Sequence, residues 1–298
     1  SGTRGRAPYD AVLTHGFVMD GDGRKMSKSL GNVVAPQKVI EQYGADILRI
    51  WVVSADYSED LRISGEILKY QADSYRRLRN TLRYLLGNLD GFTEDERVDV
   101  ADMPELERWV LHRLHELDVQ IRRDCDDFDF HSMFVALHNF CATDLSAFYF
   151  DVRKDVLYCD AANSTHRRAA RSVLDTLFHC LTVWFAPILC FTAEEAWLQR
   201  FPGETESVHR RQFVDVPDAW RDDALAAKWQ TIRRLRRVVT GALEVERREK
   251  RIGASLQAHP HVFATAADIA ALEGQDLAEI SIASAVTLVE GEGPADAF

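Results

Sequence analysis

The sequence predicts a mostly α-helical protein whose central part is a helical bundle. Apolar residues recur every three or four positions from about residue 66 to residue 250, which is the spacing of helices that bury one face. The segments on either side lack this period and contain short β-branched stretches. The length of 298 residues also suits more than one domain.

The first segment, residues 1–64, contains few elements. The apolar and β-branched residues 11–18 predict a strand, and a basic loop, residues 24–32, follows a glycine-rich turn. Pro36 suits the first turn of a short helix, and residues 45–54 predict a second one. A single strand without a visible sheet indicates a piece cut from a larger domain.

The second segment, residues 65–252, carries five apolar stripes at helical spacing, which predict a bundle. The stripes lie within residues 75–89, 104–114, 134–148, 173–198 and 232–243. We expect the fourth helix to be kinked at Pro187, because proline removes a backbone donor. A long polar connection, residues 201–223, separates it from the fifth.

The third segment, residues 253–298, returns to a mixed pattern. Residues 261–265 and 285–289 read as strands, and short helices are expected at 267–272 and 277–280. This predicts a small α/β appendix that is too short to be stable alone.

Composition narrows the function. The formal net charge of -11 excludes a positive field over the whole chain, so a polyanion must meet local arginine patches. The five cysteines are odd in number and contain no C-x-x-C pair, which argues against disulfides and zinc. The longest apolar run is too short to cross a bilayer, and no signal peptide opens the chain. We therefore expect a soluble, cytoplasmic protein.

The basic loop carries the strongest functional signal in five consecutive residues, Lys25, Met26, Ser27, Lys28 and Ser29, hereafter the signature loop. Lysine is a compact point charge on a flexible stem, so two lysines beside two hydroxyls can follow the charge of a triphosphate. Glycines on both sides allow such a loop to close. The alternative is a solvated basic surface loop without a function.

The signature loop resembles the KMSKS signature of class I aminoacyl-tRNA synthetases. Its surroundings are similar to isoleucyl-tRNA synthetases more than to their valyl, leucyl or methionyl relatives, and the resemblance covers nearly the whole chain. The segments that carry it are residues 2–9, 13–17, 20–24, 31–34, 44–49, 54–60, 75–81, 148–155, 157–160, 186–189, 191–195 and 252–256.

The resemblance implies a fold and an activity. Residues 1–64 would be the C-terminal end of a Rossmann-like class I catalytic domain, and residues 65–252 would be a helical anticodon-binding domain; residues 253–298 would be a truncated C-terminal segment. The family condenses isoleucine with ATP, acting with Mg2+, and transfers the aminoacyl group to tRNA(Ile). We expect a monomer that does not bind membranes.

The resemblance also assigns roles within the signature loop, all of whose residues are expected to bind ATP. Lys28 would be the first catalytic residue, binding the β- and γ-phosphates as negative charge builds there, and Lys25 would assist it. Met26 would pack rather than take part in chemistry. Ser27 and Ser29 would donate hydrogen bonds to the loop backbone or to phosphate.

Parts of the family pattern are missing. The second ATP signature, His-x-Gly-His, does not occur, nor do the editing domain and the zinc-binding cysteine pairs. The isolated fragment is therefore expected to be inactive. His112 and His115, three apart on a predicted helix, show metal-ligand spacing, but we expect a surface pair and no metal site.

Two arginine stripes are candidates for tRNA binding, since guanidinium groups bind phosphates and stack on bases. They are Arg76, Arg79 and Arg83, and Arg233, Arg236 and Arg237, each expected on an exposed helix face. Phe213 and Trp220, in the long connection, are candidate stacking partners. The alternative for each arginine is a solvated face or an ion pair with a nearby acid. The first stripe can also face the catalytic domain.

Three other hypotheses remain open. The chain can be the same region of a valyl-tRNA synthetase, a stand-alone tRNA-binding module with a vestigial loop, or a helical protein-interaction scaffold. The last predicts no salt-dependent tRNA binding.

Overall fold

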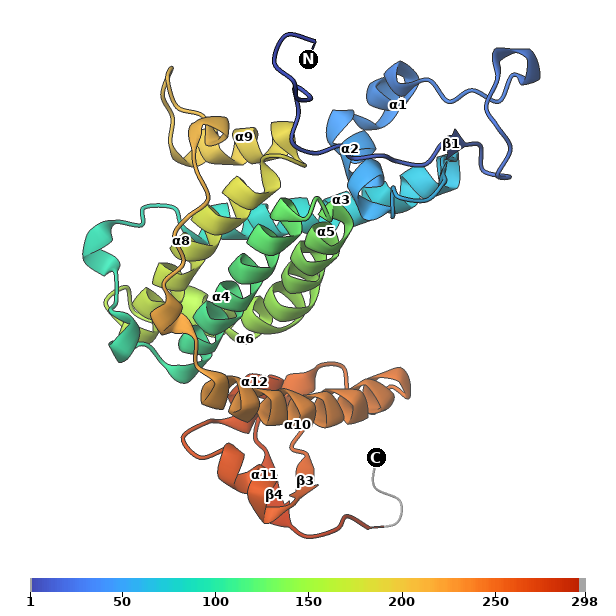
Figure 1. The fold of residues 1–298 in the computed structure, drawn as a ribbon. Coiled ribbons are helices and arrows are strands. Elements are labelled where there is room, and N and C mark those ends of the chain that lie inside the picture. The colour runs from blue at the N-terminus through green and yellow to red at the C-terminus, as the bar shows by residue number, and fades with distance from the viewer. Residues whose placement is uncertain (1, 295–298) are drawn as a thin grey trace. The chain divides into compact units, whose positions relative to one another are not determined.

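The computed structural model describes residues 2–294 and confirms the mostly helical fold, with only two small sheets in this range (Figure 1). Two compact units emerge from the residue contacts, and each combines three separate stretches of chain. Unit 1 comprises residues up to 94, 116–147 and 174–216, and unit 2 comprises residues 95–115, 148–173 and those from 217 onward. Within the described range no helix is both long and apolar enough to cross a membrane.

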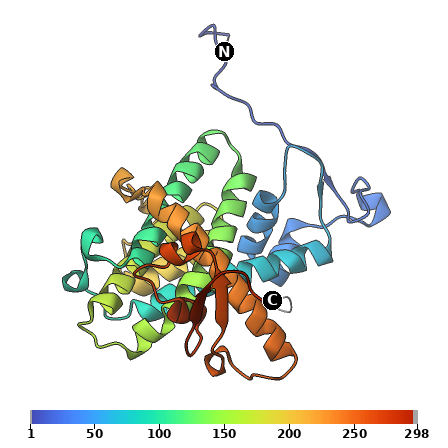
Figure 2. The same cartoon turned by 90° about the horizontal axis from the view of Figure 1, so that it is seen from below.

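The first sheet belongs to unit 1 and is shorter than predicted. β1 (Val18–Met19) pairs in parallel with β2 (Leu61–Arg62), so residues 11–17 of the predicted strand are not β-structure. A strand needs a neighbour for its backbone groups. Among residues 11–17, the Gly16 N–H donates to the Tyr57 carbonyl and the Phe17 carbonyl accepts from the Leu61 N–H. Figure 2 shows the preceding chain as an extended trace that carries no strand or helix.

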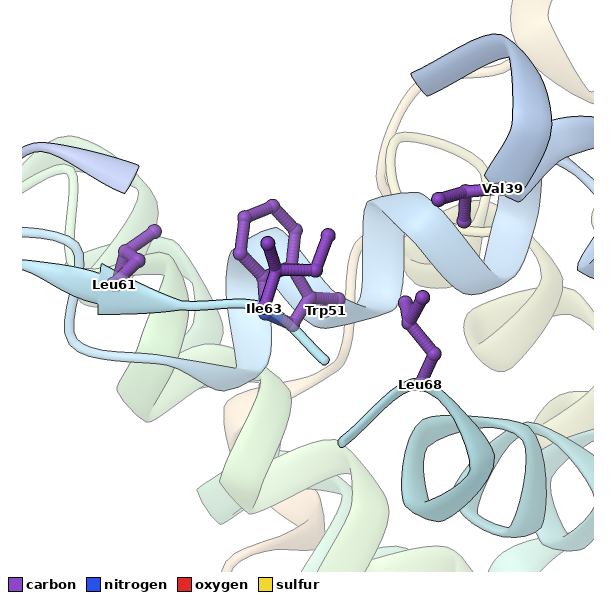
Figure 3. Close-up of a cluster of buried hydrophobic side chains, with 5 residues drawn as sticks. All are labelled: Val39, Trp51, Leu61, Ile63 and Leu68. Carbon is purple, nitrogen blue, oxygen red and sulfur yellow. The ribbon is translucent and has the colours of Figure 1, made fainter. Parts of the chain in front are cut away.

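Two short helices follow as predicted. α1 (Pro36–Tyr43) has proline in its first turn, and Gly44 separates it from α2 (Ala45–Ser54) at a φ of 89°, which favours glycine. These helices and β2 share a core of five buried apolar residues. Figure 3 shows them, with Trp51 beside Ile63: Val39, Trp51, Leu61, Ile63 and Leu68. The Trp51 indole donates a hydrogen bond to the Arg62 carbonyl at 3.0 Å.

Long helices make up the rest of unit 1. Ser64 caps α3 (Gly65–Asn88) by accepting a hydrogen bond from a backbone N–H in its first turn. α5 (Phe130–Asn139) continues into a π-helical run, η4 (Phe140–Tyr149), where one regular helix was predicted. The apolar stripe remains on the buried side, with Leu137 and Leu145 fully buried.

The predicted kinked helix around Pro187 is in fact interrupted. α8 (Thr165–Phe185) ends two residues before the proline, and α9 (Cys190–Arg200) starts after it. Proline lacks the N–H that an uninterrupted helix would need, so the chain leaves the helix here. Side chains of α2 bind the backbone groups that the break exposes, as described below.

Unit 2 contains the first half of α4 (Glu105–Asp126), the short α6 (Phe150–Val152) and α7 (Lys154–Cys159), and α10 (Asp223–Arg248). Its core is aromatic: the Trp109 ring centroid lies 5.5 Å from that of Phe148 and 6.1 Å from that of Trp229. Such pairs stabilise beyond the area they bury.

The predicted α/β appendix is present in unit 2. β3 (His261–Ala264) pairs in parallel with β4 (Thr287–Glu290), and α11 (Ala266–Ala271) and α12 (Leu277–Ser281) lie between them in sequence (Figure 1). The last four residues of the predicted segment 253–298, and Ser1, lie outside the described residues. Short 3-10 helices complete the described chain: η1 (Lys28–Leu30), η2 (Glu94–Glu96), η3 (Val100–Asp102), η5 (Val208–Arg210), η6 (Asp218–Trp220) and η7 (Ser255–Gln257).

Candidate functional site

The signature loop has an ordered backbone at both ends. Lys25 forms an isolated antiparallel bridge with Met19, the last residue of β1. Ser27 caps η1 (Lys28–Leu30) by accepting a hydrogen bond from the N–H of its last residue at 3.3 Å. Gly31 then adopts a φ of 66°, a conformation that favours glycine, and its N–H donates back to the Lys28 carbonyl. The loop is therefore a defined turn.

Asp20 holds this turn from the side that precedes it. Its carboxylate accepts hydrogen bonds from the Arg24 backbone N–H at 2.8 Å and from the Asn32 side-chain amide at 2.8 Å. Asn32 also donates to the Lys25 carbonyl at 3.2 Å and accepts from the Ser27 N–H at 2.9 Å. The Asn32 side chain thus connects Asp20, in the turn before the loop, to the backbone of Lys25 and Ser27.

The charge on Asp20 is stabilised by these bonds. The Asn32 amide, and then the Arg24 backbone N–H, lower the pKa of the Asp20 carboxyl from 3.8 to about 2, because hydrogen bonds to the ionised form favour it. Asp20 is therefore an anion throughout the neutral range. It anchors the loop as an acceptor and cannot act as a general acid.

Met26 is half-buried and points toward protein rather than solvent. Its side chain packs against the cluster of α1, α2 and β2, and its Sδ accepts a hydrogen bond from the Val34 N–H at 3.5 Å. The thioether fills space and fixes the loop from below. This geometry supports the interpretation of Met26 as a packing anchor.

Lys25 and Lys28 are exposed. Among residues 2–294, neither ammonium group makes a hydrogen bond or an ion pair. Ser27 Oγ and Ser29 Oγ lie 3.1 Å apart and share a hydrogen bond, so the hydroxyls are directed into the turn. The arrangement leaves two cations on a fixed backbone, free to move toward an anion.

The first arginine stripe lies on the exposed face of α3, as predicted. Arg76 pairs with Asp73 one turn earlier. Arg79 and Arg83 are exposed, and their side chains make no ion pair or hydrogen bond with any described residue. Both line a small pocket of about 140 Å³ between α3 and α9. These two guanidinium groups are thus available to an anion.

The second stripe does not form one exposed face, so that expectation is wrong for two of its three members. The Arg233 guanidinium lies 4.9 Å from the Trp109 ring centroid and 5.1 Å from that of Phe148. Arg236 lies 5.2 Å from the same Phe148 ring and donates to a backbone carbonyl of α12 at 2.8 Å. Because aromatic rings attract guanidinium groups, both side chains pack against the aromatic core of unit 2 and not toward solvent. Of the three, only Arg237 is exposed.

The two candidate stacking residues of the long connection are half-buried. Phe213 lies under the Arg122 guanidinium, whose carbon is 5.8 Å from the ring centroid, while Arg122 also donates to the Val214 carbonyl at 2.8 Å. Trp220 ends η6. Stacking on RNA stays a prediction for both.

The expectation of a surface histidine pair is wrong. His112 is fully buried and His115 nearly so, because both lie on the inner side of α4. The His112 Nδ1 accepts a hydrogen bond from the Asp222 backbone N–H at 2.8 Å, just before α10, and His115 Nε2 lies 3.2 Å from Asp218. No group of three or more His, Cys, Asp or Glu residues in the described range is arranged to hold a metal ion.

Two residues of α2 have a structural role that the sequence analysis did not assign. Asp46 accepts hydrogen bonds from the N–H groups of Phe191 and Thr192 at 3.2 and 2.9 Å, which caps the start of α9. Arg49 donates to the carbonyls of Pro187 and Ile188 at 2.5 and 3.1 Å. Asp46 and Arg49 are three residues apart and therefore lie on one helix face. This spacing in the sequence indicates that the two side chains contact the same neighbouring segment.

Comparison with known proteins agrees with this picture. The profile described as "Anticodon-binding domain of tRNA ligase" matches residues 107–262, more than half of the chain. The profile described as "tRNA synthetases class I (I, L, M and V)" matches residues 2–64, which include the signature loop.

Curated relatives cover the whole chain. An isoleucine–tRNA ligase of Agrobacterium fabrum is 59% identical over 99% of this chain, and those of Ruegeria pomeroyi and Bartonella henselae are 56% and 52% identical over all of it. These relatives confirm the resemblance to isoleucyl-tRNA synthetases and do not favour the valyl alternative. The chain spans only about 30% of the length of these proteins.

Solved structures share the fold. A ternary complex of an Agrobacterium radiobacter LeuRS with tRNA and LeuAMS has a TM-score of 0.53 at 20% identity, and covers 70% of this chain and 24% of that one. A Mycobacterium tuberculosis methionyl-tRNA synthetase with methionyl-adenylate has a TM-score of 0.52 at 19% identity, covering 61% of this chain and 36% of that one. With the profile match over more than half of its length, the chain belongs to the tRNA ligases that carry this anticodon-binding domain.

Proposed function

We propose that this chain supplies the phosphate-binding loop and a tRNA-binding helical region of a ligase that activates isoleucine with ATP and transfers it to tRNA(Ile). The relatives at 52% to 59% identity support the substrate. The observation that carries the proposal is the pair of ammonium groups, Lys25 and Lys28, that have no partner among residues 2–294 and lie on a turn fixed by Asp20 and Asn32.

The reaction needs a mobile cation at the leaving group. The isoleucine carboxylate attacks the α-phosphorus of ATP, and pyrophosphate leaves with the bonding electrons. Negative charge therefore builds on the β- and γ-phosphates, where Lys28 stabilises it and Lys25 assists. Both ammonium groups interact more strongly with the transition state than with the ground state. This difference in interaction energy is the condition for a faster chemical step. Met26, Ser27 and Ser29 stabilise the turn and contribute to ATP binding.

Asp20 and Asp22, in the turn before the loop, already have partners within the chain and are not proposed as magnesium ligands. Asp20 is engaged by Asn32 and Arg24, and Asp22 pairs with the Arg24 guanidinium at 2.8 Å. The proposed contribution of this chain is thus cationic, and Mg2+ would enter the reaction together with ATP. The residues of the loop fit a triphosphate, because they offer positive charge and hydroxyl groups.

The helical region binds tRNA through local positive charge. Arg79, Arg83 and Arg237 are the members of the two stripes that are exposed and whose side chains form no ion pair or hydrogen bond within the described residues. Arg76, Arg233 and Arg236 are proposed as weaker contacts, since each already has a partner within the chain. The protein is proposed to act as a cytoplasmic monomer.

The test of the catalytic proposal uses a full-length ligase that contains this chain. Lys28→Ala is expected to slow ATP–pyrophosphate exchange by orders of magnitude, while isoleucine binding measured by calorimetry stays nearly unchanged. Lys38→Ala on α1, also exposed, is the matched control and is expected to retain the parental rate. A normal exchange rate in Lys28→Ala would show that the loop has another role.

A further inference from the structure

A pocket in unit 1 has no role in the function proposed so far. It has a volume of about 660 Å³ and opens between α8, α9 and the connection after α9. Its lining combines aromatic and cationic side chains with one carboxylate: His179, Trp197, Phe201, Arg200, Arg211 and Glu206. A pocket this large holds a nucleobase with its ribose.

The aromatic rings of this pocket form one connected group. The Trp197 centroid is 4.7 Å from that of Phe201 and 5.5 Å from that of His179. The Arg211 guanidinium covers Trp197 at 5.2 Å from the ring centroid. Arginine stacked on an aromatic ring presents its opposite face as a second flat surface, and the Arg211 side chain is 44% exposed. This exposed face of the guanidinium is a flat surface on which a base can stack.

The two pocket arginines differ in their freedom. Arg200 is 13% exposed, lies against the Phe178 and Phe201 rings, and pairs with Asp175. It belongs to the wall. Among the described residues, Arg211 forms an ion pair only with Glu206, whose side chain is 33% exposed, so this pair is solvated and weak. A ligand can replace Glu206 as the partner of Arg211 at small cost.

The pocket continues around the C-terminal end of α9. It shares Arg200 and Phe201 with a second pocket of about 660 Å³, which in turn shares Arg83 and Gln199 with the pocket that Arg79 lines. The three together present four arginines and three carboxylates, against a chain net charge of -11. Arginines therefore outnumber carboxylates on this surface, although the chain as a whole is acidic, and Arg79 and Arg83 at one end have no ion pair with any described residue.

These features together fit one class of ligand. Flat cationic stacking surfaces bind bases, and unpaired guanidinium groups along a groove bind the phosphates between them, which is how proteins bind single-stranded RNA. A duplex does not fit, because its bases are stacked inside the helix and cannot reach a flat surface within a pocket.

We infer that this surface, from Arg79 and Arg83 to Arg211, binds an unpaired segment of tRNA and stacks one extruded base on the Arg211 guanidinium above Trp197. The inference rests on the proposed function, since it takes the partner to be tRNA. It adds a nucleotide pocket that the resemblance did not assign. Arg211 contacts the base, and Trp197 positions Arg211.

The experiment measures binding of the full 298-residue chain to an unmodified tRNA(Ile) transcript, by fluorescence anisotropy at several salt concentrations. Arg211→Gln is expected to weaken binding roughly tenfold, the loss typical of one stacked base. Glu206→Gln is the matched control, because it breaks the same ion pair but keeps the guanidinium; binding is expected to be equal or tighter. Thermal melts confirm that both variants fold.

A series of transcripts, each with one abasic loop nucleotide, locates the base. One of them is expected to bind the parent chain as weakly as Arg211→Gln does, with no additional loss when combined with that variant. If the parent binds tRNA(Ile) with normal salt dependence, but Arg211→Gln matches it and no abasic site couples, the pocket inference is wrong and the proposed function stands. If the parent chain does not bind tRNA at all, both fail.

Discussion

The Asn32 side chain donates a hydrogen bond to the Asp20 carboxylate at 2.8 Å and accepts one from the Ser27 N–H at 2.9 Å. This places the amide between the acidic turn before the signature loop and the serine at its centre. The loop therefore keeps a fixed backbone while its two ammonium groups stay free. Reaction at an electrostatic site depends on such preorganisation.

Replacement of Asn32 by alanine is expected to slow catalysis without removing a charged group. The variant loses the amide contacts to Asp20, Lys25 and Ser27, so the lysines spend less time in a productive position. Hydrogen bonds to charged groups are worth about 1.5–3 kcal/mol, which corresponds to a rate loss of about ten- to a hundredfold. ATP–pyrophosphate exchange in a full-length ligase measures it. Asn80→Ala, on the exposed face of α3, should keep the parental rate.

The loop is expected to lose stability in acid over a defined range. Asp20 has a pKa of about 2 when folded and 3.8 when unperturbed, so its ionised form stabilises the folded loop. This contribution is complete above about pH 4 and is lost as the pH falls through about 2. Amide exchange at Ser27, followed by NMR, should accelerate in this range. In Asp20→Asn the acceleration should be absent; an unchanged profile would show that Asp20 is not the anchor.

Arg236 and Arg237 are adjacent on α10, but substitution of Arg236 should destabilise the protein much more than substitution of Arg237. Arg236→Gln loses the Phe148 contact and the bond to the α12 carbonyl, so the free energy of unfolding should fall by about 1–3 kcal/mol. Arg237→Gln, on the exposed face, should change it by less than about 0.5 kcal/mol. Urea unfolding measures both. Equal stability losses would contradict the packing role of Arg236.

Loss of Glu107 should destabilise unit 2 strongly. This carboxylate is fully buried and accepts hydrogen bonds from Arg153 Nε and Nη2 at 2.6 and 2.7 Å and from the Tyr149 hydroxyl at 3.1 Å. Glu107→Ala leaves a buried guanidinium without its main partner, which costs about 3–5 kcal/mol. Arg153 also pairs with Glu279 at 2.8 Å, but that carboxylate is 47% exposed. Glu279→Ala should cost less than about 1 kcal/mol in the same denaturation assay.

Local rules were enough wherever the deciding interaction lies within a few residues. The first helix begins at Pro36 and the second spans residues 45–54 as predicted, because Pro36 and the intervening Gly44 act on their own backbone. The appendix strands were predicted from β-branched content, and the exposed α3 arginines from helical spacing. The signature loop was identified because its chemistry is carried by five consecutive residues.

Tertiary structure decided what depends on distant partners. The strand predicted at residues 11–18 shrank to β1, because only two residues found a neighbour in β2. Arg233 and Arg236 have the same spacing as a solvated stripe, yet aromatic rings more than eighty residues away bury them in part. His112 and His115 were expected as a surface pair but are buried, and their partners Asp222 and Asp218 lie more than one hundred residues further along the chain.

The sequence alone determined the fold class, the family resemblance and the cations of the signature loop, since these reside in contiguous residues and in a helical period. It did not determine which arginines remain free, what fixes the loop or where Arg211 meets Trp197. Those relations join segments that only the folded chain brings within a few ångströms, and interaction energies fall steeply beyond that distance.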